Sequence, residues 1–217
     1  MADSVTIIET GVGNTASVVA AFGRLGISCE RSRNAEAVAR ARAVVMPGVG
    51  AFGPGLDALR SEGLDAVVKD RISRGSPVLA VCLGLQMLCE SSAESPGAHG
   101  LSILPAAVTR IVPGPDERLP HMGWNRIDAN GPLVRSGHAY YAHSFRIPCE
   151  GFTPPAGWSI GTTDYSGRFV ASLERGPVLA CQFHPELSGS WGLGLLARWA
   201  AQAGFRPVCS NPEDRPC

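Results

Sequence analysis

The sequence predicts an α/β fold in which helices flank a mostly parallel central sheet and the second half adds antiparallel or mixed strands. Two observations carry this prediction. Over roughly the first hundred residues, short apolar segments alternate with segments of helical periodicity, which is the pattern of a parallel sheet covered on both faces. Beyond them, short strand-like segments lie between turn clusters, which indicates hairpins.

The first half supplies four expected strands and three expected helices. A β-branched strand at 5–9 opens the chain, and apolar residues at helical spacing follow at 15–25. We expect the further strands at 27–29, 43–46 and 77–81, and the further helices at 35–41 and 56–73. The segment PGVGAFGPG, 47–55, predicts a loop because Gly and Pro dominate it.

The second half is expected to hold shorter strands and one long helix. The strands are predicted at 106–112, 140–147, 159–163, 169–173 and 178–183, and the helix at 191–203. The polar, Pro-rich segment 205–217 predicts a poorly ordered tail. Because the sequence contains neither an internal repeat nor a linker, residues 1–204 are predicted to form a single domain.

Composition excludes several classes of partner and site. The 217 residues carry 19 basic and 19 acidic side chains, which argues against a nucleic-acid partner or an anionic membrane surface. The longest apolar run, 77–88, is too short to span a bilayer. Seven cysteines without a CxxC pair predict a reducing cytoplasm. The five histidines form no HxxxH or HExxH pattern, so we predict neither a metal site nor a cofactor.

A glycine motif near the start supports an alternative function. GVGNTA, 11–16, fits the dinucleotide pattern GxGxxG/A between an expected strand and an expected helix, and Glu30 falls where a ribose-binding acid would lie. This interpretation makes the chain an NAD-binding protein. Against it, the pattern is short, and nothing later in the chain resembles a hydride-transfer site. Both glycines could equally serve a tight turn.

Cys82 lies at the end of an apolar strand, in PVLAVCLGLQML, 77–88. A nucleophile on a sharp strand-to-helix turn needs small residues two positions to either side, and Ala80 and Gly84 meet that need. At the start of a helix, the positive end of the helix dipole would favour the thiolate. The turn would also leave the backbone N–H of Leu83 free to bind an oxyanion. The alternative is a buried structural cysteine.

A second stretch, CQFHPELS at 181–188, supplies what a thiol nucleophile requires. His184 is a candidate general base, and Glu186 a candidate acceptor to orient it. In extended backbone these two side chains project to the same side, and Pro185 disfavours helix at the residue before it. The two stretches together predict a Cys-His-Glu triad; an exposed turn at a strand end is the alternative for HPE alone.

Cys82 in its turn and FHPE, 183–186, resemble the triad of class I glutamine amidotransferases. Three further motifs, PGVGAFG, LPHMGWN and AHSF, together with GVGN near the start, resemble the glutaminase subunits of imidazole glycerol phosphate synthases. The resemblance covers about residues 5–203. It implies the flavodoxin-like fold of that family and hydrolysis of the glutamine side-chain amide through a γ-glutamyl thioester.

The resemblance also implies the roles of individual residues. Cys82 would be the nucleophile, His184 the base and Glu186 the group that orients it. By position, the likeness assigns the oxyanion hole to the N–H groups of Val49 and Leu83, glutamine binding to Gly50, Gln86 and Ser144, and partner docking to Gly13, Asn14, Trp124 and Asn125.

The implied partner is the cyclase subunit of imidazole glycerol phosphate synthase, in a heterodimer that channels ammonia and serves histidine biosynthesis. An alternative keeps the chemistry and changes the partner, as in the glutaminase subunit of pyridoxal 5′-phosphate synthase. The sequence departs from the family pattern at Ala80, which replaces a glycine, at Leu187, where a basic residue often stands, and at Phe145, which replaces a frequent tyrosine. The last two put individual interface contacts in doubt.

Overall fold

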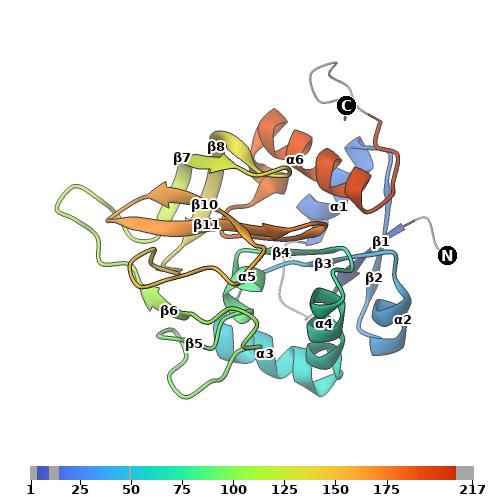
Figure 1. Cartoon of the computed structure of the whole chain (residues 1–217), viewed down its shortest axis with the longest axis horizontal. Helices are drawn as coiled ribbons and strands as arrows, with labels where there is room; N and C mark the ends of the chain where they lie inside the picture. The colour runs from blue at the N-terminus through green and yellow to red at the C-terminus, as the bar shows by residue number, and fades with distance from the viewer. Residues whose placement is uncertain (1–3, 10–14, 49, 209–217) are drawn as a thin grey trace.

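The computed structural model describes residues 4–9, 15–48 and 50–208 (Figure 1). Its main sheet has nine strands in the order β2-β1-β3-β4-β12-β11-β10-β7-β8. The strands are β1 Ser4–Ile8, β2 Ser28–Ser32, β3 Ala43–Met46, β4 Val78–Val81, β7 His121–Asn130, β8 Arg135–His143, β10 Ser159–Asp164, β11 Arg168–Arg175 and β12 Val178–Cys181. A small second sheet is formed by β5 Ser91–Ser92, β6 Ala107–Arg110 and β9 Phe145–Arg146.

The sheet changes from parallel to antiparallel pairing at β12. Strands β2, β1, β3, β4 and β12 run parallel, and β12 then pairs with β11 in the antiparallel sense. Strands β10, β7 and β8 continue the antiparallel half. The predicted α/β class, with a parallel first half and antiparallel strands in the second, is confirmed.

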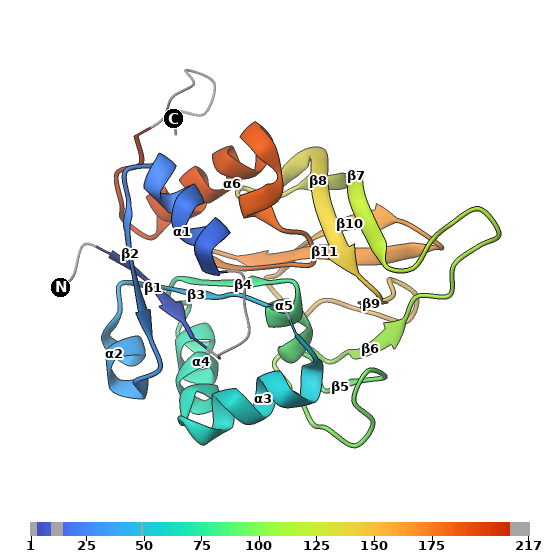
Figure 2. The same ribbon diagram turned by 180° about the vertical axis from the view of Figure 1, so that it is seen from behind.

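Helices cover both faces of the parallel half, as Figures 1 and 2 show from opposite sides. They are α1 Thr15–Arg24, α2 Ala35–Arg40, α3 Phe52–Ser61, α4 Leu64–Ser73, α5 Leu83–Met87, the short 3₁₀ helix η1 Pro185–Leu187 and α6 Gly189–Gln202. Alternate residues of each strand enter two separate cores. Val45 and Leu79 pack toward α1 and α6, whereas Val44 and Val78 pack toward α2, α3 and α4.

Two expected elements differ in the structure. The single helix predicted at 56–73 is two helices, α3 and α4, because Gly63 between them adopts the left-handed conformation at φ 67°. The loop predicted at 47–55 ends early, since α3 begins at Phe52. Pro54 falls in the first turn of α3, where a missing N–H costs no hydrogen bond.

The antiparallel half holds an element that was not predicted. Strand β7 pairs with β8 over most of its length, but its side chains are mostly exposed or half-buried. HMGWNRIDAN therefore lacks the apolar alternation that identifies a strand. Strand β8 begins at Arg135, five residues before the predicted start at 140, for the same reason.

The end of the described chain packs against the domain. Phe205 is 7% exposed and belongs to the core that contains α1 and α6. The N–H of Val208 donates to the carbonyl oxygen of Leu25 at 2.9 Å. The packed region thus continues past the boundary predicted at 204, and residues 209–217 lie outside the described residues.

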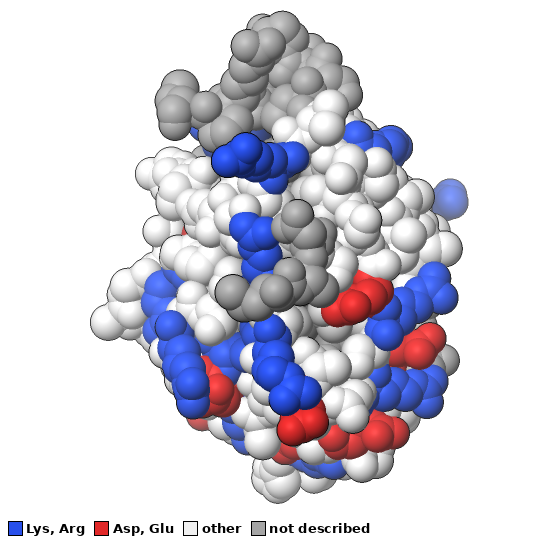
Figure 3. All heavy atoms as spheres, turned by 90° about the vertical axis from the view of Figure 1, so that its right-hand side faces the viewer, with Lys and Arg blue, Asp and Glu red and all other residues white. Residues whose placement is uncertain are grey.

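Charged side chains of opposite sign pair at the surface. Arg40 pairs with Glu36 at 3.2 Å and Arg74 with Asp70 at 2.8 Å, each across one helical turn. On the face in Figure 3, basic and acidic side chains lie next to one another over the lower part. Within the described ranges, every helix falls short of the length or the apolar character needed to cross a bilayer.

Candidate active site

Topology brings the two predicted halves of the site together. Strands β4 and β12 are parallel neighbours, with Ala80 opposite Ala180 and Val81 opposite Cys181. Cys82 directly follows β4, and His184 follows β12 by three residues. The two segments therefore leave the same edge of the sheet side by side, at the point where its pairing changes. Open α/β sheets commonly place their sites in such crevices at the carboxyl ends of strands.

Cys82 occupies the sharp turn that the sequence predicts. Its backbone has φ 51° and ψ −106°, a strained conformation for a residue other than glycine. Its N–H donates to the carbonyl oxygen of Cys181 at 2.7 Å, which fixes the turn to the end of β12. Cys82 is 7% exposed and lines a cavity, so the alternative of a sealed structural cysteine does not hold.

Close backbone packing explains the small residues around the turn. A Cβ atom at Gly84 would lie 2.5 Å from the carbonyl oxygen of Met46. A Cβ at Gly48 would lie 2.3 Å from the nitrogen of Gly84 and from the oxygen of Val81. The methyl group of Ala80 would stand 3.5 Å from a Cβ at Gly84, which is ordinary contact. The Ala80 departure from the family pattern is therefore accommodated.

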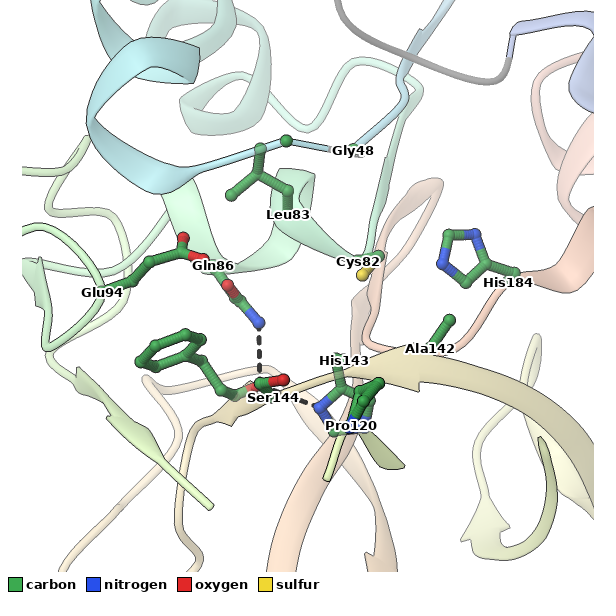
Figure 4. Close-up of a pocket in the computed structure, with 12 residues that line it drawn as sticks. Gly48, Cys82, Leu83, Gln86, Glu94, Pro120, Ala142, His143, Ser144 and His184 are labelled. Atoms are coloured by element: carbon green, nitrogen blue, oxygen red, sulfur yellow. Dashed lines mark hydrogen bonds between the residues drawn. The ribbon is translucent and has the colours of Figure 1, made fainter. Parts of the chain in front are cut away.

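His184 and Glu186 form a buried pair, with Nδ1 and Oε1 2.9 Å apart. A carboxylate accepts, so the proton of this contact lies on Nδ1, and Nε2 is left for the sulfur. Figure 4 shows the imidazole ring beside Cys82. The extended backbone expected through 184–186 is present only at His184, because Pro185–Leu187 form the 3₁₀ helix η1. The tight turn still brings the carboxylate to the ring.

The surroundings of His184 favour its charged form. Burial lowers its pKa, but hydrogen bonding to Cys82 and to Glu186 outweighs that effect and raises the pKa to about 10. Both hydrogen-bond partners, Cys82 and Glu186, are residues that the sequence predicted for the triad. The imidazolium therefore faces the sulfur as a hydrogen-bond donor and as a positive charge.

The predicted oxyanion hole differs in part from expectation. The N–H of Leu83 is engaged, since it donates to the carbonyl oxygen of Gly48 at 3.4 Å. Val49, the other predicted donor, lies outside the described residues. Helix α5 has only five residues, so the dipole expected to favour a thiolate at Cys82 is small.

The cavity beside Cys82 has a volume of about 260 Å³. Its walls include the three predicted substrate residues, Gly50, Gln86 and Ser144. Gln86 and Ser144 are labelled in Figure 4. A cavity below the usual range for drug-sized ligands suits a single amino acid better than a dinucleotide.

Gln86 has a defined orientation. Its Nε2 donates to the carbonyl oxygen of Phe145 at 2.9 Å and to Oε1 of Gln182 at 3.0 Å. Because an amide has two N–H groups, both are used, and Oε1 is left for a ligand. Gln86 can therefore only accept a hydrogen bond from a molecule in the cavity.

Several residues of the site were not predicted, among them Glu94 and Gln182. Glu94 lines the cavity, and its Oε2 accepts the N–H of Phe52 at 2.8 Å. Its loop carries no motif that could have identified it. Gln182 is fully buried and donates from Nε2 to the sulfur of Cys82 at 3.4 Å. It lies within CQFHPELS, a stretch whose pattern predicts a role only for the histidine and the glutamate.

His143, which was not predicted either, lines another wall of the cavity and pairs with His121 behind it. Nδ1 of His143 donates to the carbonyl oxygen of Phe145 at 2.8 Å, so Nε2 accepts from Nδ1 of His121 at 3.0 Å. Desolvation lowers the pKa of His143 to about 3 and that of His121 to about 4. Both rings are therefore neutral near pH 7.

The predicted partner-facing residues have different surroundings. Trp124 is 57% exposed on β7, with its ring against that of Tyr140. Asn125 is turned toward the protein, where Nδ2 donates to the carbonyl oxygen of Asp164 at 3.0 Å. Gly13 and Asn14 lie outside the described residues. Leu187, one of the departures, is 40% exposed.

The dinucleotide alternative gains no support from the described residues. Its glycines, Gly11 and Gly13, lie outside them. Glu30, the expected ribose ligand, accepts a hydrogen bond from the hydroxyl of Thr6 at 2.7 Å.

Comparison with known proteins gives one family. The model of "Glutamine amidotransferase class-I" matches residues 6–198. Solved structures share the fold: a glutamine amidotransferase crystal structure has a TM-score of 0.72 at 22% identity, covering 93% of this chain and 99% of its own. A glutamine amidotransferase from Thermotoga maritima has a TM-score of 0.55 at 17% identity, covering 93% of this chain and 82% of its own.

Similar curated sequences are named as imidazole glycerol phosphate synthases or their HisH subunits. The imidazole glycerol phosphate synthase subunit HisH of Deinococcus radiodurans is 37% identical over 91% of this chain and 93% of its own. That of Rhodopirellula baltica is 39% identical over 90% and 96%. The chloroplastic imidazole glycerol phosphate synthase hisHF of Arabidopsis thaliana is 36% identical over 90% of this chain, which spans 33% of that longer protein. The chain therefore belongs to the class-I glutamine amidotransferase family and, within it, to the HisH subunits of imidazole glycerol phosphate synthase.

Proposed function

We propose that this chain hydrolyses glutamine to glutamate and ammonia and passes the ammonia to a cyclase subunit that makes imidazole glycerol phosphate in histidine biosynthesis. The observation that carries the proposal is the meeting of Cys82, on its strained turn, with the buried His184–Glu186 pair in one cavity. The relatives named HisH supply the pathway and the kind of partner.

Glutamine binding follows from the groups that face the cavity. The α-ammonium of the substrate is a donor only, and it would pair with the carboxylate of Glu94 and with Oε1 of Gln86. The hydroxyl of Ser144 can donate to the α-carboxylate, and Gly50 leaves room beside it. The side-chain amide would then lie against the sulfur of Cys82.

The first half of the reaction forms the thioester. The Cys82 thiolate attacks the amide carbon, and the carbonyl electrons move onto oxygen to form a tetrahedral oxyanion. The imidazolium of His184 donates its Nε2 proton to the leaving nitrogen as the C–N bond breaks. Ammonia departs, and a γ-glutamyl thioester remains on Cys82.

The second half releases glutamate. His184, now neutral, takes a proton from water as the water oxygen attacks the thioester carbon. Collapse of that intermediate breaks the C–S bond and restores the thiolate–imidazolium pair. Glu186 holds the ring in one orientation throughout and stabilises its positive charge.

The oxyanion requires N–H donors, and the Leu83 N–H is occupied by the carbonyl oxygen of Gly48. We propose that Val49 and Leu83 supply the two donors after the peptide at Gly48 turns away. Loss of one such donor typically costs about 10²–10³ in rate. The free chain is therefore expected to be a slow glutaminase.

The partner is proposed to dock beside the cavity at the face that carries Trp124. Only neutral ammonia attacks an electrophile, and most ammonia in water near pH 7 is protonated, so a closed path to an acceptor site is required. The HisH name describes one subunit of a synthase, and the Arabidopsis relative has a chain about three times as long as the part matched here. We predict that the chain acts in the cytoplasm. We also predict that it docks its partner through Gly13, Asn14, Trp124 and Asn125.

The test is reconstitution with the cyclase subunit from the same genome. The two chains should co-purify and together make imidazole glycerol phosphate from glutamine. With Cys82→Ala in this chain, synthesis should continue from added ammonium salt at high pH but not from glutamine. Equal synthesis from glutamine by the variant would refute the catalytic role, and failure to form a complex would refute the partner.

A further inference from the structure

Gln182 lies between the end of β12 and His184, and no part of its side chain is exposed. Its Nε2 donates to the sulfur of Cys82 at 3.4 Å, a distance typical of an N–H···S hydrogen bond. Burying a side-chain amide costs free energy unless its polar atoms form hydrogen bonds. Here both ends of the amide have partners.

The direction of this amide is fixed by a group that can only accept. The carbonyl oxygen of Phe145 requires that the atom of Gln86 beside it is Nε2. That nitrogen also lies 3.0 Å from the Gln182 side chain, so the atom it meets must be Oε1. The remaining atom of Gln182, Nε2, then faces the sulfur. The carbonyl oxygen of Phe145 thus fixes the orientation of the Gln86 amide, and that amide fixes the orientation of Gln182. As a result, Gln182 donates an N–H to Cys82.

We propose that Gln182 is a further catalytic residue, whose side-chain N–H holds the Cys82 thiolate in place and stabilises its charge, with Gln86 and Phe145 fixing the direction of that N–H. Sulfur accepts hydrogen bonds weakly as a thiol and much more strongly as an anion. The bond therefore favours the reactive form. It is also independent of His184, which changes protonation state during the reaction.

Other groups near the sulfur cannot take over this task. The N–H of Leu83 is bonded to Gly48 and, once released, is assigned to the oxyanion, and α5 is too short for a strong dipole. The titratable groups near Cys82 include His184, with Glu186 behind it, and the fully buried Cys181, which is kept as a thiol because burial raises its pKa far above the ordinary range. Glu94 and the neutral His143 line the same cavity. Among these, only His184 brings positive charge, and it must give up its proton to the leaving nitrogen.

The experiment measures the thiolate directly. Gln182→Met keeps the side-chain length and removes both polar atoms. The rate of Cys82 alkylation by iodoacetamide would be followed from pH 5 to 10 on the full-length chain, with the modified peptide quantified by mass spectrometry so that other cysteines do not contribute. We expect the alkylation profile to move upward by about one pH unit. In the reconstituted complex, kcat for glutamine should fall about tenfold with little change in KM.

Controls separate this role from a structural one. Thr163→Val removes another buried hydrogen bond, that between Thr163 and Tyr141, without touching the sulfur or its partners. It should lower stability and leave the alkylation profile unchanged. If Gln182→Met folds poorly, Gln182→Asn, which draws the N–H back from the sulfur by one methylene, should give the same shift.

The proposal rests on the proposed function, but the two can fail separately. Alkylation needs neither glutamine nor the cyclase, so it reports the Gln182–Cys82 contact even if the chain has another activity. An unshifted profile in folded Gln182→Met and Gln182→Asn would overturn the role of Gln182 while leaving the triad intact. Retained glutaminase activity in Cys82→Ala would overturn the triad instead.

Discussion

Two walls of the same cavity each carry a buried histidine, and the two have opposite properties. His184 has its pKa raised to about 10, whereas the pKa of His143 is lowered to about 3. Both rings are almost completely removed from water. Burial alone lowers a histidine pKa, so it explains His143 directly. His184 differs because it lies between a carboxylate and a sulfur.

The difference lies in the partners at the two ring nitrogens. His143 donates to the carbonyl oxygen of Phe145 and accepts from His121, so a neutral ring satisfies both contacts. His184 meets Glu186 at one nitrogen and Cys82 at the other, and a doubly protonated ring satisfies both. The wall with His184 is therefore suited to proton transfer, whereas both ring nitrogens of His143 are already bonded within the protein.

The largest expected effect comes from Cys82→Ala, which removes the sulfur from the charged wall. Glutaminase turnover in the complex should fall by at least about 10⁴-fold, because the reaction loses its nucleophile. In the same variant, the pKa of His184, followed by NMR titration of the ring, should drop below 10. An unchanged His184 titration would mean that the sulfur does not help to hold its charge.

Glu186→Gln should lower the pKa of His184 and so make this ring more like the neutral His143. The amide keeps the size of the carboxylate but removes its charge, so the pKa of His184 should fall and the ring should lose its fixed orientation. We expect kcat to decrease by about 10²–10⁴-fold, with KM changed little. Turnover as a function of pH would reveal the shift. Glu150→Gln, at an exposed surface glutamate, is a suitable control.

Glu94→Gln tests the binding side of the cavity. The variant removes the negative charge expected to meet the α-ammonium of glutamine, while its amide oxygen can still accept the N–H of Phe52. KM for glutamine should rise about 10–100-fold and kcat should change only a few-fold, since a hydrogen bond to a charged group is lost far from the reacting bond. A fall in kcat with an unchanged KM would place Glu94 in the chemistry instead.

The neutral wall is expected to affect the acid stability of the fold rather than turnover. In the unfolded chain, histidine binds a proton near pH 6.5, whereas His121 and His143 in the fold do so only near pH 4 and pH 3. Between about pH 6.5 and 4 the unfolded chain therefore binds more protons. The free energy of unfolding should fall as pH falls in this window, by up to about 1.4 kcal/mol per pH unit for each histidine.

His143→Gln checks this dependence, because a glutamine side chain can donate to Phe145 and accept from His121 but does not titrate. Urea unfolding between pH 7 and 4 should show a shallower fall in the free energy of unfolding than in the wild-type chain. The matched control is His138→Gln, at an exposed position, which should keep the wild-type slope. Equal slopes in the two variants would contradict a buried neutral pair.

Sequence reasoning was reliable where the signal is local. The strand at 43–46, the turn at Cys82 and the pairing of His184 with Glu186 each depend on residues within a few positions of one another. The break at Gly63 and the strand at 121–130 were missed. The first arises where Gly63, in the left-handed conformation, interrupts a stretch that otherwise has helical periodicity. The second depends on pairing with a partner strand rather than on its own apolar pattern.

The amino-acid sequence by itself determined the fold class, the family and the three residues of the proposed triad, because strand alternation and short motifs lie in consecutive residues. Only the tertiary structure decided which groups surround them. Gln182 meets Cys82 across 100 positions and Gln86 across 96, Gln86 meets Phe145 across 59, and Glu94 caps Phe52 across 42. The contacts of Gln182 exist only once the sheet has brought β4 beside β12, and the other two also join segments far apart in the sequence, so no local pattern can predict them.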